Sequence, residues 1–140
     1  MSDEQSVGKI QLASDLSLLH RVESLVGEAT AGTGLDHAST ADIVTAVSEI
    51  VINAMVHGNR LDHDLHVDIE TFADTDQVKV VVQDEGEGFD PGAVSDPTQP
   101  DRLLLPNGRG LFISKMLCDG LVFSRQESGM RVELTKRTKP

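Results

Sequence analysis

Three polar side chains recur at four-residue spacing within an otherwise apolar stretch, DIVTAVSEIVINAMVHGN, which spans residues 42–59. They are Glu49, Asn53 and His57. At about 100° of rotation per residue, this spacing lines them up along one edge of a helix. An amide oxygen is a ligand that Mg²⁺ accepts, and a carboxylate one turn away could act as a general base toward a hydroxyl. A solvated helix edge with an i,i+4 hydrogen bond explains the same spacing, so these residues alone leave both interpretations open.

A second candidate is the stretch QDEGEGFDP, residues 83–91, which comes directly after a valine-rich run. Asp84 stands at the end of the predicted strand, where its carboxylate could accept a hydrogen bond from an amino group of a ligand. Gly86 and Gly88 allow positive φ and a close approach of the backbone. Taken alone, the stretch is more typical of a hairpin turn or a loop corner. A calcium loop of the EF-hand type is excluded, because its Gly and Glu spacing is absent.

A third candidate is the glycine-rich segment Gly108-Arg109-Gly110-Leu111, at the start of a predicted helix that ends at Leu117. The N-terminus of a helix presents free N–H groups and the positive end of the helix dipole to an anion. The guanidinium of Arg109 adds a planar positive fork that suits phosphate oxygens. Entry into a helix after a loop explains these glycines nearly as well, so this segment alone is weak support for a phosphate site.

The elements that must position these residues follow from hydrophobic periodicity and from turn residues. The predicted elements are, in order, a strand over 7–12, a helix over 16–26, a long helix from a capping box at 39–42 to Gly58-Asn59, a hairpin of strands over 65–70 and 78–82, a helix over 110–117, and an antiparallel pair over 121–125 and 130–134. Residues 90–107, with four prolines, form one long loop of the kind that is either a functional lid or disordered. The basic tail over 136–140 is interpreted as solvated charge.

Size and charge limit the classes of protein that this chain can represent. Its 140 residues suffice for one domain with a hydrophobic core. A formal charge of −11 would repel a nucleic-acid backbone, so no direct nucleic-acid binding is expected. Cys118 is the single cysteine, which excludes an internal disulfide. The chain shows no signal-peptide pattern and no apolar run of membrane-spanning length, which predicts a soluble cytoplasmic protein without membrane association.

The order of the three candidates is more specific than any one of them. A helix with E-x-x-x-N, a strand followed by D-x-G-x-G-F, a long loop and then G-R-G-L resembles the GHKL-type ATP-binding fold, also called the Bergerat fold. Within that group, SEIVINAMVHGN, DEGEGFDP and NGRGLFISKM are most similar to the anti-sigma factor serine/threonine kinases of bacterial partner switches. The resemblance covers residues 7–134. It implies an α+β fold, a two-layer α/β sandwich whose mixed, mostly antiparallel sheet carries helices on one face. It also implies a single histidine-kinase-like ATPase domain over residues 1–140, with an ATP lid at 90–107.

The resemblance further implies a role for each matching residue. Glu49 would be the general base, Asn53 the Mg²⁺ ligand, and Asp84 the acid that receives the adenine amino group. His57 would support the helix end or the lid. The glycine clusters would contact the nucleotide, with Gly86 and Gly88 at the adenine, Gly108, Gly110 and Leu111 at the phosphates, and Arg109 near the γ-phosphate. The sequence departs from the family at residue 130, where methionine replaces a common threonine, so no hydroxyl contact with the adenine is expected there.

The activity that the resemblance implies is transfer of the γ-phosphoryl group of Mg·ATP to a serine or threonine of a protein. The implied substrate is a STAS-type anti-anti-sigma factor, and the implied second partner is an RNA polymerase sigma factor. Dimers in the family imply a homodimer. The alternative is an ATP-binding regulatory module that sequesters or activates a protein partner without phosphoryl transfer.

Overall fold

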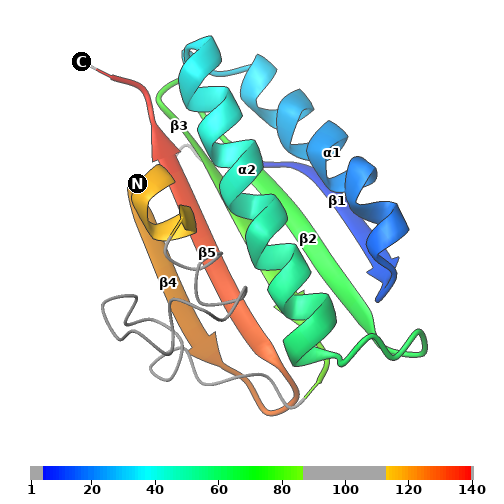
Figure 1. Cartoon of the computed structure of the whole chain (residues 1–140). Coiled ribbons are helices and arrows are strands. Elements are labelled where there is room, and N and C mark those ends of the chain that lie inside the picture. Colours follow the sequence, from blue (N-terminus) through cyan, green and yellow to red (C-terminus); the bar gives the residue numbers. More distant parts are fainter. Residues whose placement is uncertain (1–4, 87–112, 140) are drawn as a thin grey trace.

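The computed structural model describes residues 5–86 and 113–139, and its described strands form one antiparallel sheet in the order β1-β2-β3-β5-β4 (Figure 1). The strands are β1 (Gln5–Ala13), β2 (His66–Ala73), β3 (Gln77–Asp84), β4 (Gly120–Arg125) and β5 (Met130–Arg137). The helical elements are the 3₁₀ turn η1 (Leu16–Leu18), α1 (Leu19–Ala31), α2 (His37–Asn53) and the π turn η2 (Ala54–Gly58), and residues 113–117 are also helical. Each element predicted within the described residues is therefore present.

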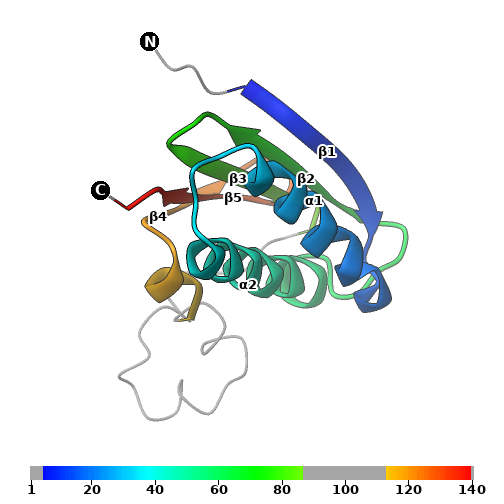
Figure 2. The ribbon, with the colours of Figure 1, turned by 90° about the horizontal axis from the view of Figure 1, so that it is seen from above.

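Two helices cover one face of this sheet. Figure 2 shows α1 and α2 on the same side, with no described helix on the opposite face. Helix α1 packs against β2 and α2, while α2 packs against β5 and β3. The predicted two-layer α+β sandwich is confirmed. All four described strand pairings are antiparallel, so the mixed component of the prediction is not found among the described strands.

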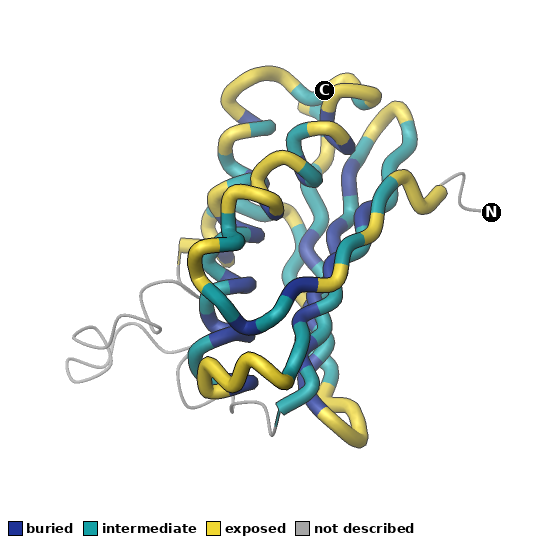
Figure 3. Tube along the Cα trace, turned by 90° about the vertical axis from the view of Figure 1, so that its right-hand side faces the viewer, coloured by how far each residue is buried: buried dark blue, intermediate teal, exposed yellow. Residues whose placement is uncertain are grey.

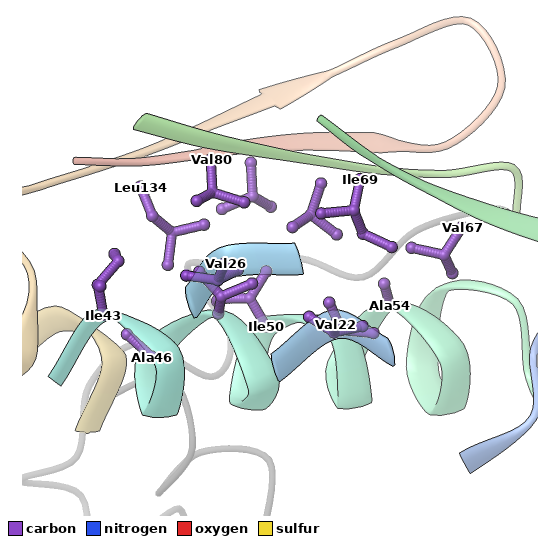
Figure 4. Close-up of a cluster of buried hydrophobic side chains, with 14 of the residues drawn as sticks. Val22, Val26, Ile43, Ala46, Ile50, Ala54, Val67, Ile69, Val80 and Leu134 are labelled. Carbon is purple, nitrogen blue, oxygen red and sulfur yellow. The ribbon is translucent and has the colours of Figure 1, made fainter. Parts of the chain in front are cut away.

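The core between the layers is aliphatic. Side chains alternate along β2 and β3, so every second residue points toward the helices. Figure 4 shows these side chains meeting the apolar faces of α1 and α2, and Figure 3 shows the buried segments facing one another across the layers. The core residues labelled in Figure 4 are Val22, Val26, Ile43, Ala46, Ile50, Ala54, Val67, Ile69, Val80 and Leu134. Burial of each large aliphatic side chain contributes about 1.5–3 kcal/mol relative to exposure, which makes this layer the main source of stability.

Helix α2 begins earlier than its predicted capping box. The carboxylate of Asp36 accepts a hydrogen bond from the backbone N–H of Ser39 (2.7 Å), so Asp36 is the N-cap. The prediction of a cap at residues 39–42 is wrong, because Asp36 already satisfies a free N–H group of the first turn. The hydrogen bond from the Ser39 N–H lowers the pKa of Asp36.

Helix α2 ends at Asn53 and continues as the π turn η2, which ends at the predicted stop. The π turn η2 is closed by a hydrogen bond from the Asn59 N–H to the Ala54 carbonyl (2.8 Å), and Arg60 and Leu61 follow with positive φ of 53° and 54°. The segment His37–Gly58 has the length and mean hydropathy of a membrane span, contrary to the expectation from sequence. Half of it is buried against the sheet and α1, as expected for the core helix of a two-layer fold.

Candidate functional site

Asp84 lies at the last inward-facing position of β3. The inward positions before it are valines, and the alternation continues to residue 84, so its carboxylate faces the helix layer. Asp84 is 2% exposed, and its Oδ1 accepts a hydrogen bond from the backbone N–H of Met130 (3.1 Å). Burial raises the pKa of this carboxyl, although backbone hydrogen bonds from Met130 and Gly86 and the positive charge of Arg125 lower it. A buried acceptor at a strand end suits recognition of an amino group.

Three glycines from separate parts of the chain surround Asp84. A Cβ on Gly58, at the end of η2, would overlap Oδ2 of Asp84, and a Cβ on Gly86 would overlap the carbonyl oxygen of Gly58. Gly129, in the turn between β4 and β5, has a φ of +105°, and a Cβ there would overlap the carbonyl oxygen of Asp84. The backbone at this corner therefore lies closer to Asp84 than any side chain would permit. The predicted place of Gly86 beside an adenine stays a prediction.

Asn59 joins the segments that meet at the same corner. It is 1% exposed; Nδ2 donates to Ser14 Oγ (2.8 Å) and to the His66 carbonyl (3.0 Å), and Oδ1 accepts from the Glu85 N–H (3.0 Å). No role is predicted for Asn59 from the sequence, although it is the last residue of the motif SEIVINAMVHGN. An asparagine after the glycine of a helix end is also typical of an ordinary C-cap.

Glu49 and Asn53 lie one turn apart on α2, as their spacing predicts. Glu49 is partly buried, while Asn53 is 3% exposed, and its Nδ2 has no hydrogen-bond partner in the part of the chain that the structure describes. Leaving a buried amide unpaired costs about 1–3 kcal/mol, so a ligand that pairs with it would be favoured. The amide nitrogen of Asn53 can donate to a phosphate oxygen, and its amide oxygen can bind Mg²⁺.

His57 belongs to the π turn η2 and not to α2. Hydrogen bonds in a π turn enclose one more residue than those in an α-helix, so each residue rotates the chain less. His57 lies in the turn that continues α2 beyond Asn53, and its predicted role stays a prediction. His57 is partly buried, and burial lowers the pKa of its imidazole, which favours the neutral form at pH 7.

The short helix before β4 is tied to α2 and to β5. Ser114 is fully buried, and its Oγ donates to the Ala46 carbonyl (3.0 Å). Lys136 of β5 donates from Nζ to the Leu117 carbonyl (2.7 Å), and Nζ lies 3.5 Å from Oδ2 of Asp42. The interpretation of the basic tail as solvated charge is wrong at Lys136, because β5 includes this residue and directs it to two acceptors.

Among the described residues, two hollows open beside the Asp84 corner. The larger, of about 610 Å³, is lined by Gly58, Gly86 and Ser128 among others. The smaller, of about 450 Å³, is lined by Asp84 and residues of the β4–β5 turn. Neither includes Asn53, so they flank the corner without joining it to α2. Within the described residues, no cluster of three His, Cys, Asp or Glu side chains is suited to hold a metal.

Several predicted site residues lie outside the described residues. They are Gly88, Gly108, Arg109, Gly110 and Leu111, together with the predicted lid over 90–107. The described residues bring together Asp84, Gly86 and the end of η2, and place Glu49 and Asn53 on the preceding helix. The roles predicted for all of these residues stay predictions.

The sequence matches a known protein family and several named proteins. Residues 12–136 match the family described as the histidine kinase-like ATPase domain. The anti-sigma F factor of Clostridium botulinum (strain Eklund 17B) is 34% identical over 102 residues, which cover 69% of this chain and 70% of that protein. The serine-protein kinase RsbW of Staphylococcus epidermidis is 25% identical over an alignment of 148 residues, which covers 99% of this chain and 91% of that protein.

A solved structure has the same fold. The crystal structure of the RsbU and RsbW domains of Rv1364c from Mycobacterium tuberculosis matches with a TM-score of 0.65 at 23% identity. The match covers 96% of this chain and 34% of that longer chain, and the likeness concerns the fold alone.

The antiparallel sheet with helices on one face, the buried Asp84 corner and the family match define the class: the chain belongs to the histidine kinase-like ATPase domain family. Relatives named anti-sigma F factor and serine-protein kinase RsbW indicate a narrower group within this family. Within the family, the chain is a member of the GHKL-type anti-sigma factor serine/threonine kinases, in agreement with the resemblance read from its motifs.

Proposed function

We propose that this protein is a Mg·ATP-dependent serine/threonine kinase that acts as an anti-sigma factor in a partner switch and phosphorylates a STAS-type anti-anti-sigma factor. The observation that carries the proposal is a pair of buried polar side chains near η2. Asn53 precedes η2 with an unpartnered amide nitrogen, and Asp84 lies against Gly58 at the end of η2. A buried amide nitrogen without a partner is uncommon in a protein interior, and a bound ligand would account for it at Asn53.

The base end of the site is assigned to Asp84. Its carboxylate would accept a hydrogen bond from the adenine 6-amino group, and Gly86 with Gly88 would let the backbone lie close to the base. Met130 supplies only its backbone N–H to Asp84, because its side chain is 2% exposed and packs in the core. Base recognition would therefore rely on Asp84 without a hydroxyl from residue 130.

The phosphate end is assigned to α2 and to the glycine segment that follows the proposed lid. Asn53 would hold Mg²⁺ through its amide oxygen, and Glu49, one turn earlier, would orient and deprotonate the incoming hydroxyl. When bound, Mg²⁺ neutralises charge on the phosphate oxygens. The segment Gly108, Arg109, Gly110 and Leu111 would contact the phosphates, with Arg109 balancing charge on the γ-phosphoryl group. His57 would support the end of the helix.

We further propose that the kinase is one domain over residues 1–140 with an ATP lid at 90–107. It would form a homodimer and sequester a sigma factor. It would be located in the cytoplasm, without direct contact to nucleic acid or membrane. Relatives named anti-sigma F factor support the sigma factor partner.

Transfer of label from γ-³²P-ATP to a STAS-type protein encoded beside this chain tests the proposal. Glu49→Gln should lower transfer by about 10²- to 10⁴-fold, the usual contribution of a general base, while ATP binding persists. Glu28→Gln, at an exposed position of α1, is the matched control and should leave transfer unchanged. ATP binding without any transfer would favour the regulatory module, and absence of nucleotide binding would overturn the proposal altogether.

A further inference from the structure

We infer that Asn59 is a positioning residue that sets where Asp84 meets a base, and so controls how well the protein distinguishes adenine from a base without a 6-amino group. The inference rests on the proposed function, because it concerns how the proposed base acceptor is held.

The side chain of Asn59 joins three segments that are distant in sequence. Nδ2 donates to Ser14, directly after β1, and to His66, at the start of β2, while Oδ1 accepts from the N–H of Glu85. If the amide oxygen and nitrogen were exchanged, the oxygen would face two acceptors, Ser14 Oγ and the His66 carbonyl. The nitrogen would face another donor, the Glu85 N–H. The amide therefore has one favourable orientation.

The contact with Glu85 matters because strand pairing has ended there. The last pairs of β3 are Val67 with Asp84 on the β2 side and Arg131 with Gln83 on the β5 side. The Oδ1 of Asn59 takes the next N–H, so it extends the hydrogen bonding by one residue beyond the sheet. Glu85 makes a second contact, in which its carboxylate lies 3.6 Å from Nδ1 of His66.

The hydrogen bond between Asn59 and Glu85 fixes one flank of Asp84, and the β4–β5 turn fixes the other. On one flank Asn59 holds Glu85, which keeps Gly86 against the carbonyl oxygen of Gly58. On the other flank the Met130 N–H holds Oδ1 of Asp84. Loss of the Asn59 amide would leave the Glu85 N–H unpaired and release one flank, while the other remains.

The affinities for ATP and for inosine triphosphate measure the position of Asp84. Inosine triphosphate keeps the ribose and the phosphates but carries a carbonyl where adenine has the amino group. The ratio of the two dissociation constants therefore reports the base end alone. We expect the wild-type protein to prefer ATP, and Asn59→Ala to reduce this preference by about three- to thirty-fold, the range of couplings transmitted through one contact.

Two further variants separate positioning from general destabilisation. Ser14→Ala removes the hydroxyl partner of Nδ2 and its hydrogen bond to the Leu65 carbonyl (2.9 Å), but leaves the contact between Asn59 and Glu85. It should lower the melting temperature while the ATP preference is unchanged. Asn59→Asp keeps an acceptor for the Glu85 N–H and should retain more of the preference than Asn59→Ala.

An unchanged preference in Asn59→Ala, or an equal loss in Ser14→Ala, would overturn the positioning role. Failure of the wild-type protein to bind ATP, or to prefer it, would instead overturn the proposed function, so the two failures are told apart before any variant is made. All measurements are made below the melting temperature of the least stable variant, determined by circular dichroism.

Discussion

Gly58 lies against the carboxylate of Asp84 so closely that a Cβ on the glycine would overlap Oδ2. This contact joins the end of the π turn η2 to the end of β3. It brings the helix that carries Glu49 and Asn53 next to the strand that carries the proposed base acceptor.

Gly58→Ala should destabilise the fold and weaken ATP binding. The added methyl group must displace either Asp84 or η2, and overpacking of this kind typically costs about 1–3 kcal/mol. Urea unfolding and an ATP titration measure the two effects. Gly27→Ala in α1 is the control, because a Cβ there meets no heavy atom within 4 Å, and it should stabilise by about 0.5–1 kcal/mol. Equal stability of Gly58→Ala and wild type would contradict the contact.

Asp84→Asn should be more stable than wild type at neutral pH while losing ATP affinity. Burial raises the pKa of Asp84 above its ordinary value of 3.8, so stability from this group is present below pH 3.8 and is lost as the pH rises through the raised pKa. A neutral amide avoids that loss. Free energies of unfolding across the acid range should show the gain of Asp84→Asn disappearing toward pH 3.8. A pH-independent difference would argue against a buried titrating group.

His57 should make stability depend on pH in the mildly acidic range. Burial lowers its pKa below 6.5, so the unfolded chain binds the proton first. The stabilisation is fully present above pH 6.5 and is lost as the pH falls from 6.5 toward the lowered pKa. His57→Gln should remove this loss, as measured by unfolding at pH 7.5 and pH 5.5. His37→Gln, at an exposed position of α2, is the comparison, and an identical effect there would refute the assignment.

Lys136→Met should destabilise the docking of the short helix before β4. It removes the charged hydrogen bond to the Leu117 carbonyl and the ion pair with Asp42, while a side chain of similar length remains. A charged hydrogen bond contributes about 1.5–3 kcal/mol, and we expect a loss near the lower value. Hydrogen exchange at the Cys118 amide, which donates to the Ser114 carbonyl (3.1 Å), should accelerate. Lys139→Met, at an exposed position, should change neither quantity.

Much of the fold could be predicted because it depends on neighbouring residues. The alternation from Val78 to Val82 predicts β3 and also sets Asp84 on the inward face. The glycine at residue 58 predicts the end of the helical segment, which is the last residue of η2, although the change from α2 to the π turn at Ala54 is not predicted. The N-cap was misplaced because Asp36 and Ser39 are both good capping residues, and only the hydrogen bond to Asp36 shows which one is used.

Most of the secondary structure, the family and the residue types that a nucleotide site needs could be predicted from contiguous residues. The groups that reach Asp84 could not, because sheet order places β5 beside β3 and so brings Met130 and Gly129 to it from a distant part of the chain. The same holds for Asn59, whose three partners lie directly after β1, at the start of β2 and directly after β3. Local periodicity is a property of contiguous residues, whereas these contacts depend on how the strands are ordered in space.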